Sequence, residues 1–136
     1  MQSRNSSLNT IRLDRISETI KSEMSSDEHF QNSVLRPIIK FQNDLLIAAF
    51  LNFSNKYKNV FFKLSTEKKI TYIENAIAKD SSFRNILKDM IVGLFTVEEY
   101  NAYTLNASAL NKRISGIIKE RLISHVQLLS EMEPKA

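Results

Sequence analysis

Five polar residues stand where the surrounding helical pattern otherwise places apolar side chains. Gln42 and Asn43 interrupt the long apolar stretch in the middle of the chain, and Asn111, Arg121 and His125 interrupt the last one. Burying an unsatisfied polar group costs roughly 1–3 kcal/mol, so we predict that the two stretches pack together and share hydrogen bonds. The set is then either a structural network that fixes helix register or the floor of a ligand pocket.

Other residue patterns that could support chemistry are few. His29 and His125 lie far apart without metal-binding spacing, and cysteine does not occur. No glycine-rich phosphate-binding motif or G-x-S-x-G motif is present, and the carboxylates Asp44, Glu74 and Asp89 have no spacing that requires them to meet. The sequence therefore assigns no catalytic residue, metal ligand or cofactor, and an enzymatic activity is left open.

The element that must position the first two polar residues is a helix predicted over Leu35–Tyr57. Its apolar side chains surround the helix axis, which is typical of a membrane span or of a buried central helix. Polar residues over 40–44 stop the apolar run well short of the ~18 residues that a span requires, so we predict a buried central helix. Pro37 fits its first turn.

The remaining stretches read as shorter helices with recognisable N-terminal caps. We predict an all-α, single-domain bundle of five to seven helices around the central one, with 107–129 as its main partner and flexible tails at 1–9 and 131–136. Caps are predicted at Ser65, at Asp80–Ser82, at Asn106, and as capping boxes at 25–28 and 96–99. The predicted helices besides the central one are 11–23, 25–34, 66–79, 82–92, 97–105 and 107–130. Gly93 is predicted to end 82–92 in a left-handed conformation.

Composition narrows the class of protein. The chain has 136 residues, a net charge of +4 and only two glycines and two prolines, which favours helices over a sheet rich in tight turns. Residues 34–95 hold ten basic and five acidic side chains, mostly scattered lysines, which suits a solvated surface better than a nucleic-acid interface. With no secretion signal or membrane span in the sequence, we expect a cytoplasmic protein that binds neither nucleic acid nor membrane.

Three segments, LRPIIKFQNDLLIAAF, IENAIAKDSSFRNILKDMIVGLFTVEEY and SALNKRISGIIKERL, resemble a small all-helical family from Bacteroidetes-type bacteria. The resemblance covers about Leu35–His125 and implies an all-helical fold of uncharacterised role. Some members carry the label glyoxalase. The chain has neither the His and Glu metal ligands of paired βαβββ glyoxalases, nor a THxHxDH motif, nor the cysteine of the cofactor-free type.

Two functions are compatible with these patterns. The first is a helical interaction or scaffold protein that forms a homodimer. Its support is a surplus of large apolar residues in connectors and short helices, and the candidate interface is Phe95, Tyr100 and Tyr103. The second is a small-molecule-binding protein or enzyme whose pocket lies between the central and last helices.

Overall fold

Helices make up all of the regular structure in the parts of the chain that the structure describes. The computed structural model describes residues 2–12 and 26–134. The helices are α1 Gln2–Ile11, α2 Ser26–Phe30, a π-helical turn Gln31–Leu35, α3 Arg36–Phe41, α4 Asn43–Lys56, a 3-10 turn Val60–Lys63, α5 Thr66–Lys79, α6 Ser81–Val92, α7 Val97–Thr104, α8 Ala107–Ser124 and α9 Val126–Ser130. The prediction of an all-α, single-domain bundle is confirmed.

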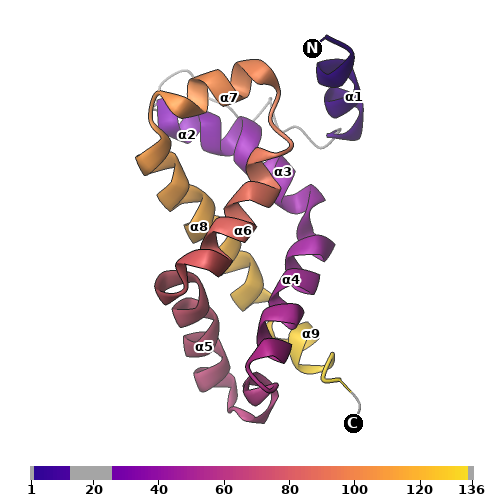
Figure 1. Cartoon of the computed structure of the whole chain (residues 1–136), viewed down its shortest axis with the longest axis vertical. Coiled ribbons are helices and arrows are strands. Elements are labelled where there is room, and N and C mark those ends of the chain that lie inside the picture. The colour runs from indigo at the N-terminus through magenta and orange to yellow at the C-terminus, as the bar shows by residue number, and fades with distance from the viewer. Residues whose placement is uncertain (1, 13–25, 135–136) are drawn as a thin grey trace.

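The bundle is elongated, with α8 behind α6 in the view of Figure 1. Helices α5, α6 and α8 each contact the other two, and α4 packs against α6 from the other side. The short helices α2, α3 and α7 gather at one end, and the 3-10 turn lies with the start of α5 at the other. None of the helices described within 2–12 and 26–134 is long and apolar enough to cross a membrane.

The predicted central helix is real but interrupted twice. The chain passes from α2 through the π-helical turn directly into α3, so the predicted 25–34 and central helices form one kinked rod. Pro37 lies in the first turn of α3. Because proline cannot donate a backbone hydrogen bond, a wider turn just before it accommodates the kink. The second interruption is Gln42, with φ −86° and ψ 6°.

The central rod is buried on one side only, which corrects the prediction of a helix buried all round. Ile38 and Phe50 are fully buried. Phe41 and Leu45, by contrast, are 52% and 46% exposed. An apolar stripe therefore remains open to solvent along α3 and α4, on the side away from the core.

Side-chain caps start the helices of the hairpin formed by α5 and α6. Ser65 Oγ accepts from Lys68 N at 3.3 Å, and Asp80 Oδ1 accepts from Phe83 N at 2.9 Å. Each cap satisfies a backbone N–H that has no partner inside its own helix. Helix α5 has the predicted bounds, and α6 begins one residue earlier than predicted.

The connection from α6 to α7 combines one wrong prediction with one that is confirmed. Gly93 caps α6 with φ −61°, so it is right-handed and not left-handed as predicted. The capping box at the start of α7 is present. Thr96 Oγ1 accepts from Glu99 N at 3.2 Å, and Glu99 Oε1 accepts from Thr96 N at 2.8 Å.

The last predicted helix is divided at His125, where φ is −102° and ψ is 16°. Helix α8 ends at Ser124, with His125 as its C-cap, and α9 begins at Val126. Asn106, predicted as the cap of this helix, makes no capping hydrogen bond. Its Nδ2 instead donates to the carboxylate of Asp27 at 2.9 Å, which ties the start of α8 to α2.

The N-terminal segment forms helix α1, whereas we expected residues 1–9 to be a loose tail. Leu8 is buried, and Arg4 Nη1 donates to Phe95 O at 2.7 Å. Most of the helix predicted over 11–23, and Ser25 of the first predicted capping box, lie outside the described residues.

Aromatic rings fill the core between α4, α5 and α6. The Phe50 ring meets that of Phe61 edge-on, with centroids 5.1 Å apart, and that of Tyr72 at 6.0 Å. Phe53 stacks on Phe83 at 4.3 Å. Such contacts add about 0.5–1.5 kcal/mol each beyond area burial, so this cluster holds the three helices together.

Candidate functional site

The structure joins one pair of the five candidate polar residues across helices. Arg121 Nη1, on α8, donates to Asn43 Oδ1, on α4, at 3.1 Å. The central and last helices therefore share a polar contact, as the sequence led us to expect. Both side chains are partly exposed, so the contact is not a desolvated ion site.

The other three candidates differ in how they relate to this pair. His125 Nδ1 lies 2.7 Å from Arg121 O, within its own helical turn. Gln42 Nε2 donates to Met90 O on α6 at 2.9 Å. Asn111 Oδ1 accepts from the Tyr103 hydroxyl at 2.6 Å. Asn43, Arg121 and His125 are therefore linked, and Gln42 and Asn111 have other partners.

Two of the three candidate interface residues are interior. Phe95 is 2% exposed and Tyr103 7% exposed, with ring centroids 5.6 Å apart. Phe95 also meets the Phe30 ring edge-on at 5.5 Å. Both rings thus pack inside their own chain, and within this cluster Tyr100, 48% exposed, is the residue open to a partner.

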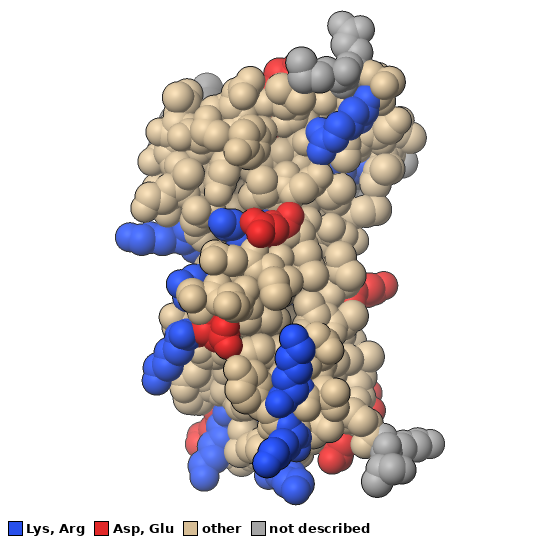
Figure 2. Space-filling model, viewed as in Figure 1, with Lys and Arg blue, Asp and Glu red and all other residues tan. Residues whose placement is uncertain are grey.

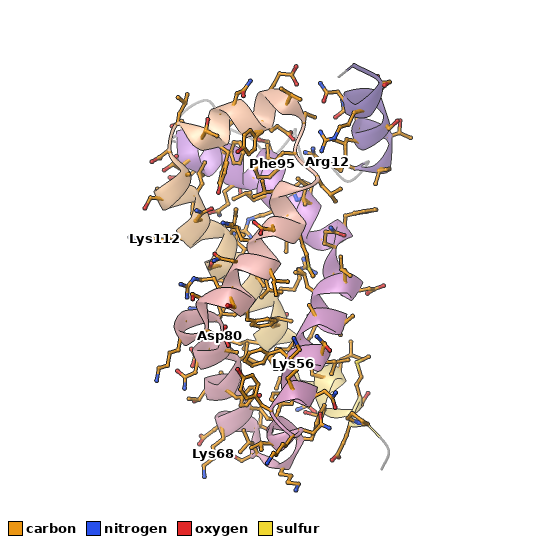
Figure 3. All side chains as sticks on the ribbon, in the orientation of Figure 1. Arg12, Lys56, Lys68, Asp80, Phe95 and Lys112 are labelled. Atoms are coloured by element: carbon orange, nitrogen blue, oxygen red, sulfur yellow. The ribbon has the colours of Figure 1, made fainter. Side chains whose placement is uncertain are left out.

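The most buried charged group within residues 2–12 and 26–134 was not among the candidates. The Arg12 side chain is fully buried and forms a double hydrogen bond with Glu99, Nη1 to Oε1 at 2.7 Å and Nη2 to Oε2 at 2.9 Å. Arg12 Nη1 also donates to Leu94 O at 3.1 Å. Figure 3 shows Arg12 reaching from the end of α1 towards the loop that carries Phe95. The sequence offered no signal for this pair, because Glu99 reads as a helix cap and Arg12 as an ordinary helical residue.

The first of two surfaces of interest is a groove lined by α5, α6 and α8, with a volume of about 370 Å³. We call it the basic groove because four of its lining side chains are cationic and one is a carboxylate. The lining includes Glu74, Arg84, Lys88, Lys112, Gly116 and Lys119. Asn111 is the one of the five candidate polar residues that lines this groove. A pocket that includes a candidate residue is therefore formed by α8 with α5 and α6, and not by α8 with α4.

The second surface, which we call the apolar face, runs along α3, α4 and α6. It consists of Phe41, Leu45, Phe53, Tyr57, Ile86 and Met90. A groove of about 290 Å³ crosses this face, and four of the six residues line it. In Figure 2 the area between α4 and α6 carries few charged side chains.

Two chemical properties complete the description of the surfaces. Within residues 2–12 and 26–134, no group of three or more His, Cys, Asp or Glu side chains is placed to hold a metal ion. Burial raises the pKa of the Tyr72 phenol above its ordinary value, the neighbouring Ser54 hydroxyl opposes this shift, and Tyr57 adds to it.

Comparison with protein-family models, with curated proteins and with solved structures finds no match. The resemblance to a bacterial helical family therefore stays a prediction, and we argue the function from the basic groove and the apolar face.

Proposed function

We propose that this protein is a helical interaction protein that forms a two-fold symmetric dimer through the apolar face. The observation that supports this most directly is the exposure of four large side chains on one face of the molecule. Phe41 and Tyr57 are each 52% exposed, Ile86 is 49% exposed and Leu45 46%. Large exposed apolar patches on soluble domains mark interaction sites.

Four of the six residues of the apolar face meet in one groove. Phe53 and Tyr57 are four residues apart along α4 and its C-terminal cap, so they are neighbours on that helix, and Leu45 lies about 80° round the helix from Phe53. Ile86 and Met90 have the same spacing on α6, and they line the 290 Å³ groove together with Phe53 and Tyr57. The hydrogen bond from Gln42 to Met90 O holds the two helices together near Phe41.

The distribution of charge around the apolar face favours a second copy of this chain as the partner. Lys56 lies at the end of α4, beside Tyr57 (Figure 3). Asp89 lies near the opposite end of the face, next to Met90 in the chain. Its carboxylate is 71% exposed and only loosely paired with Lys88 at 3.7 Å. A two-fold axis through the face exchanges the two ends, which brings Lys56 of each copy towards Asp89 of the other.

Ile86→Glu tests the dimer, because a charge in a desolvated contact is strongly unfavourable. We expect the wild type to be a dimer at micromolar concentration by light scattering, and Ile86→Glu to be a monomer with unchanged helical circular dichroism. Tyr100→Glu is the matched control, since Tyr100 is equally exposed but lies on the other candidate interface. It should remain dimeric.

Charge reversal tests the symmetry of the contact. Lys56→Glu and Asp89→Lys should each weaken the dimer, and the two changes in one chain should restore it because each copy again presents opposite charges. A monomeric wild type, or a dimer that Tyr100→Glu dissociates and Ile86→Glu does not, would overturn the proposal.

We also propose a bacterial protein, on the resemblance to a family from Bacteroidetes-type bacteria, and keep the cytoplasmic location expected from the sequence as part of the proposal. Fractionation of cells that produce the protein from its own gene would test the location.

A further inference from the structure

The geometry points to the basic groove as a binding site for a small phosphorylated sugar. This site is independent of the proposed dimer, because the groove lies between α5, α6 and α8 and the apolar face lies on α3, α4 and α6. In Figure 2 the basic side chains on this side of the bundle gather along the left edge, where Figure 3 labels Lys112.

The charges that line the groove are unbalanced. Arg84 and Lys88 come from α6, Lys112 and Lys119 from α8, and Glu74 is the one acidic residue among the lining side chains. In the part of the chain that the structure describes, no carboxylate lies within ion-pair distance of Arg84, Lys112 or Lys119. Like charges held together around a concave surface raise the local concentration of anions. A ligand with more than one negative charge is the species that relieves this repulsion.

One cationic side chain of the groove, Arg84, is held in place by hydrogen bonds to the backbone. Arg84 Nη1 donates to the last carbonyls of α5, Ile77 O at 2.9 Å and Ala78 O at 3.0 Å. These bonds hold the guanidinium at the rim, so its orientation is set before a ligand arrives. A preorganised guanidinium is well suited to a phosphate because its planar N–H groups match two phosphate oxygens.

The floor of the groove lies against the backbone of α8. Gly116 contributes no side chain, and a Cβ built there would meet nothing within 4 Å. Helix interiors seldom hold glycine, which costs about 1 kcal/mol relative to alanine, and no neighbouring atom explains its presence here. The empty space at Gly116 is therefore groove volume that a ligand can use.

Uncharged groups in the lining indicate what the rest of the ligand looks like. Asn111 Oδ1 accepts from the Tyr103 hydroxyl, which leaves the Nδ2 donors of Asn111 for a ligand. Asn85 and Ser115 add further hydrogen-bonding groups, and Glu74 can accept from a hydroxyl. No aromatic ring is among the residues that line the groove, so nothing there stacks on a nucleobase. A volume of about 370 Å³ lies at the small end of the range for ligand pockets. These features together favour a phosphorylated sugar over a nucleotide.

Isothermal titration calorimetry with ribose 5-phosphate and glucose 6-phosphate tests the site, with thermal shift as a second readout. We expect saturable binding of at least one sugar phosphate at constant ionic strength. Unphosphorylated glucose should not bind, and sodium sulfate and AMP should bind more weakly. Equal effects of sulfate and sugar phosphate would show general anion screening and would overturn the proposal.

Variants with matched charge locate the site. Lys112→Gln with Lys119→Gln removes two charges from the groove, and Lys63→Gln with Lys68→Gln removes two from the far end of the molecule, where Figure 3 labels Lys68. We expect the groove pair to weaken binding by about tenfold or more, and the distal pair to change it by less than about twofold. Equal losses in both pairs would overturn the site.

Gly116 provides a test that leaves the charges unchanged. Gly116→Ala should raise the melting temperature through its higher helix propensity, which shows that the position tolerates a side chain. Gly116→Leu should then fold and abolish binding by occupying the groove. Undiminished binding by a folded Gly116→Leu variant would contradict the proposal, as would binding of an acidic phosphopeptide or RNA through these residues without binding of any sugar phosphate.

Discussion

Glu99→Gln separates the two roles of Glu99, because glutamine preserves the capping box of α7 while it removes the charge that faces Arg12. The variant keeps nearly the same shape and leaves every other contact of α1 in place. Any change in the docking of α1 is therefore attributable to the ion pair.

The structure sets the size of the expected effect. The Arg12 side chain is fully buried, and its Nε makes no hydrogen bond within the described residues. After the substitution, the amide oxygen in the place of Oε1 still accepts from Arg12 Nη1, as does Leu94 O at 3.1 Å, but the amide N–H₂ in the place of Oε2 cannot accept from Arg12 Nη2. Removing one member of a buried ion pair costs about 3–5 kcal/mol. Because Glu99 is 11% exposed and the Leu94 contact stays, we expect a loss of about 3 kcal/mol, near the lower limit of that range.

Hydrogen bonds tie α1 and Arg12 to one segment of the chain, residues 93–99, so we expect the loss to appear first as undocking of α1. Amide hydrogen exchange measures this directly. Protection of residues 2–11 should fall roughly 100-fold, while protection in α8 should stay unchanged. In the matched variant Arg12→Met the fully buried guanidinium is gone, and Glu99, 11% exposed, keeps its bond to Thr96 N and a path to water, so the loss should be about 1 kcal/mol. If Arg12→Met costs as much as Glu99→Gln, or if neither alters exchange in α1, the account of this pair is wrong.

Three further predictions concern stability, each measured by urea denaturation. Lys58 has φ 62°, so Lys58→Gly should raise the free energy of unfolding by about 0.5 kcal/mol, whereas Glu120→Gly within α8 should lower it by about 1 kcal/mol. Asn43→Ala should cost about 1 kcal/mol, and the absence of coupling to Arg121→Met in a double-mutant cycle would contradict the hydrogen bond between them. Because the folded-state pKa of Tyr72 is raised from 10.0, its contribution to stability is present below about pH 10 and is lost as pH rises through the raised value. Tyr72→Phe should therefore reduce the alkaline loss of stability, and an identical alkaline profile for the variant would contradict this shift.

The sequence predicted best the features that depend on neighbouring residues. The caps at Ser65, Asp80 and Thr96 act within three residues along the chain, so the local sequence contains the whole interaction. The bounds of α5 followed directly from them, and the start of α6 was predicted to within one residue. Arg12 and Glu99 represent the opposite case, since 87 positions separate them in the chain. No local pattern reports a contact between side chains so far apart.

Burial on the central helix was predicted less well, because a helical wheel shows which residues share a face and not which faces have neighbours. Phe41 and Leu45 look like core residues on a wheel, but no helix among those described covers them. The same limit applies to Phe95 and Tyr103, which looked like surplus apolar residues in a connector and a short helix. Tertiary packing places them inside, against Phe30. Phe41 and Leu45, which we expected in the core, are therefore exposed, and Phe95 and Tyr103, which we expected at an interface, are buried.

Two of the five polar residues in apolar stretches mark helix breaks, and another two, Asn43 and Arg121, form the expected polar contact between α4 and α8. Gln42 and His125 are the two residues at which the central and last helices are interrupted. A helical wheel drawn through such a break assigns the later residues to the wrong face, because a non-helical residue changes the direction in which the following side chains point. A break also frees backbone groups, which need polar partners. His125 Nδ1 lies against Arg121 O, four residues earlier, and Gln42 bonds the backbone of α6 at Met90. In a long helical pattern, an isolated polar residue on the apolar side should therefore first be tested as the site of a kink.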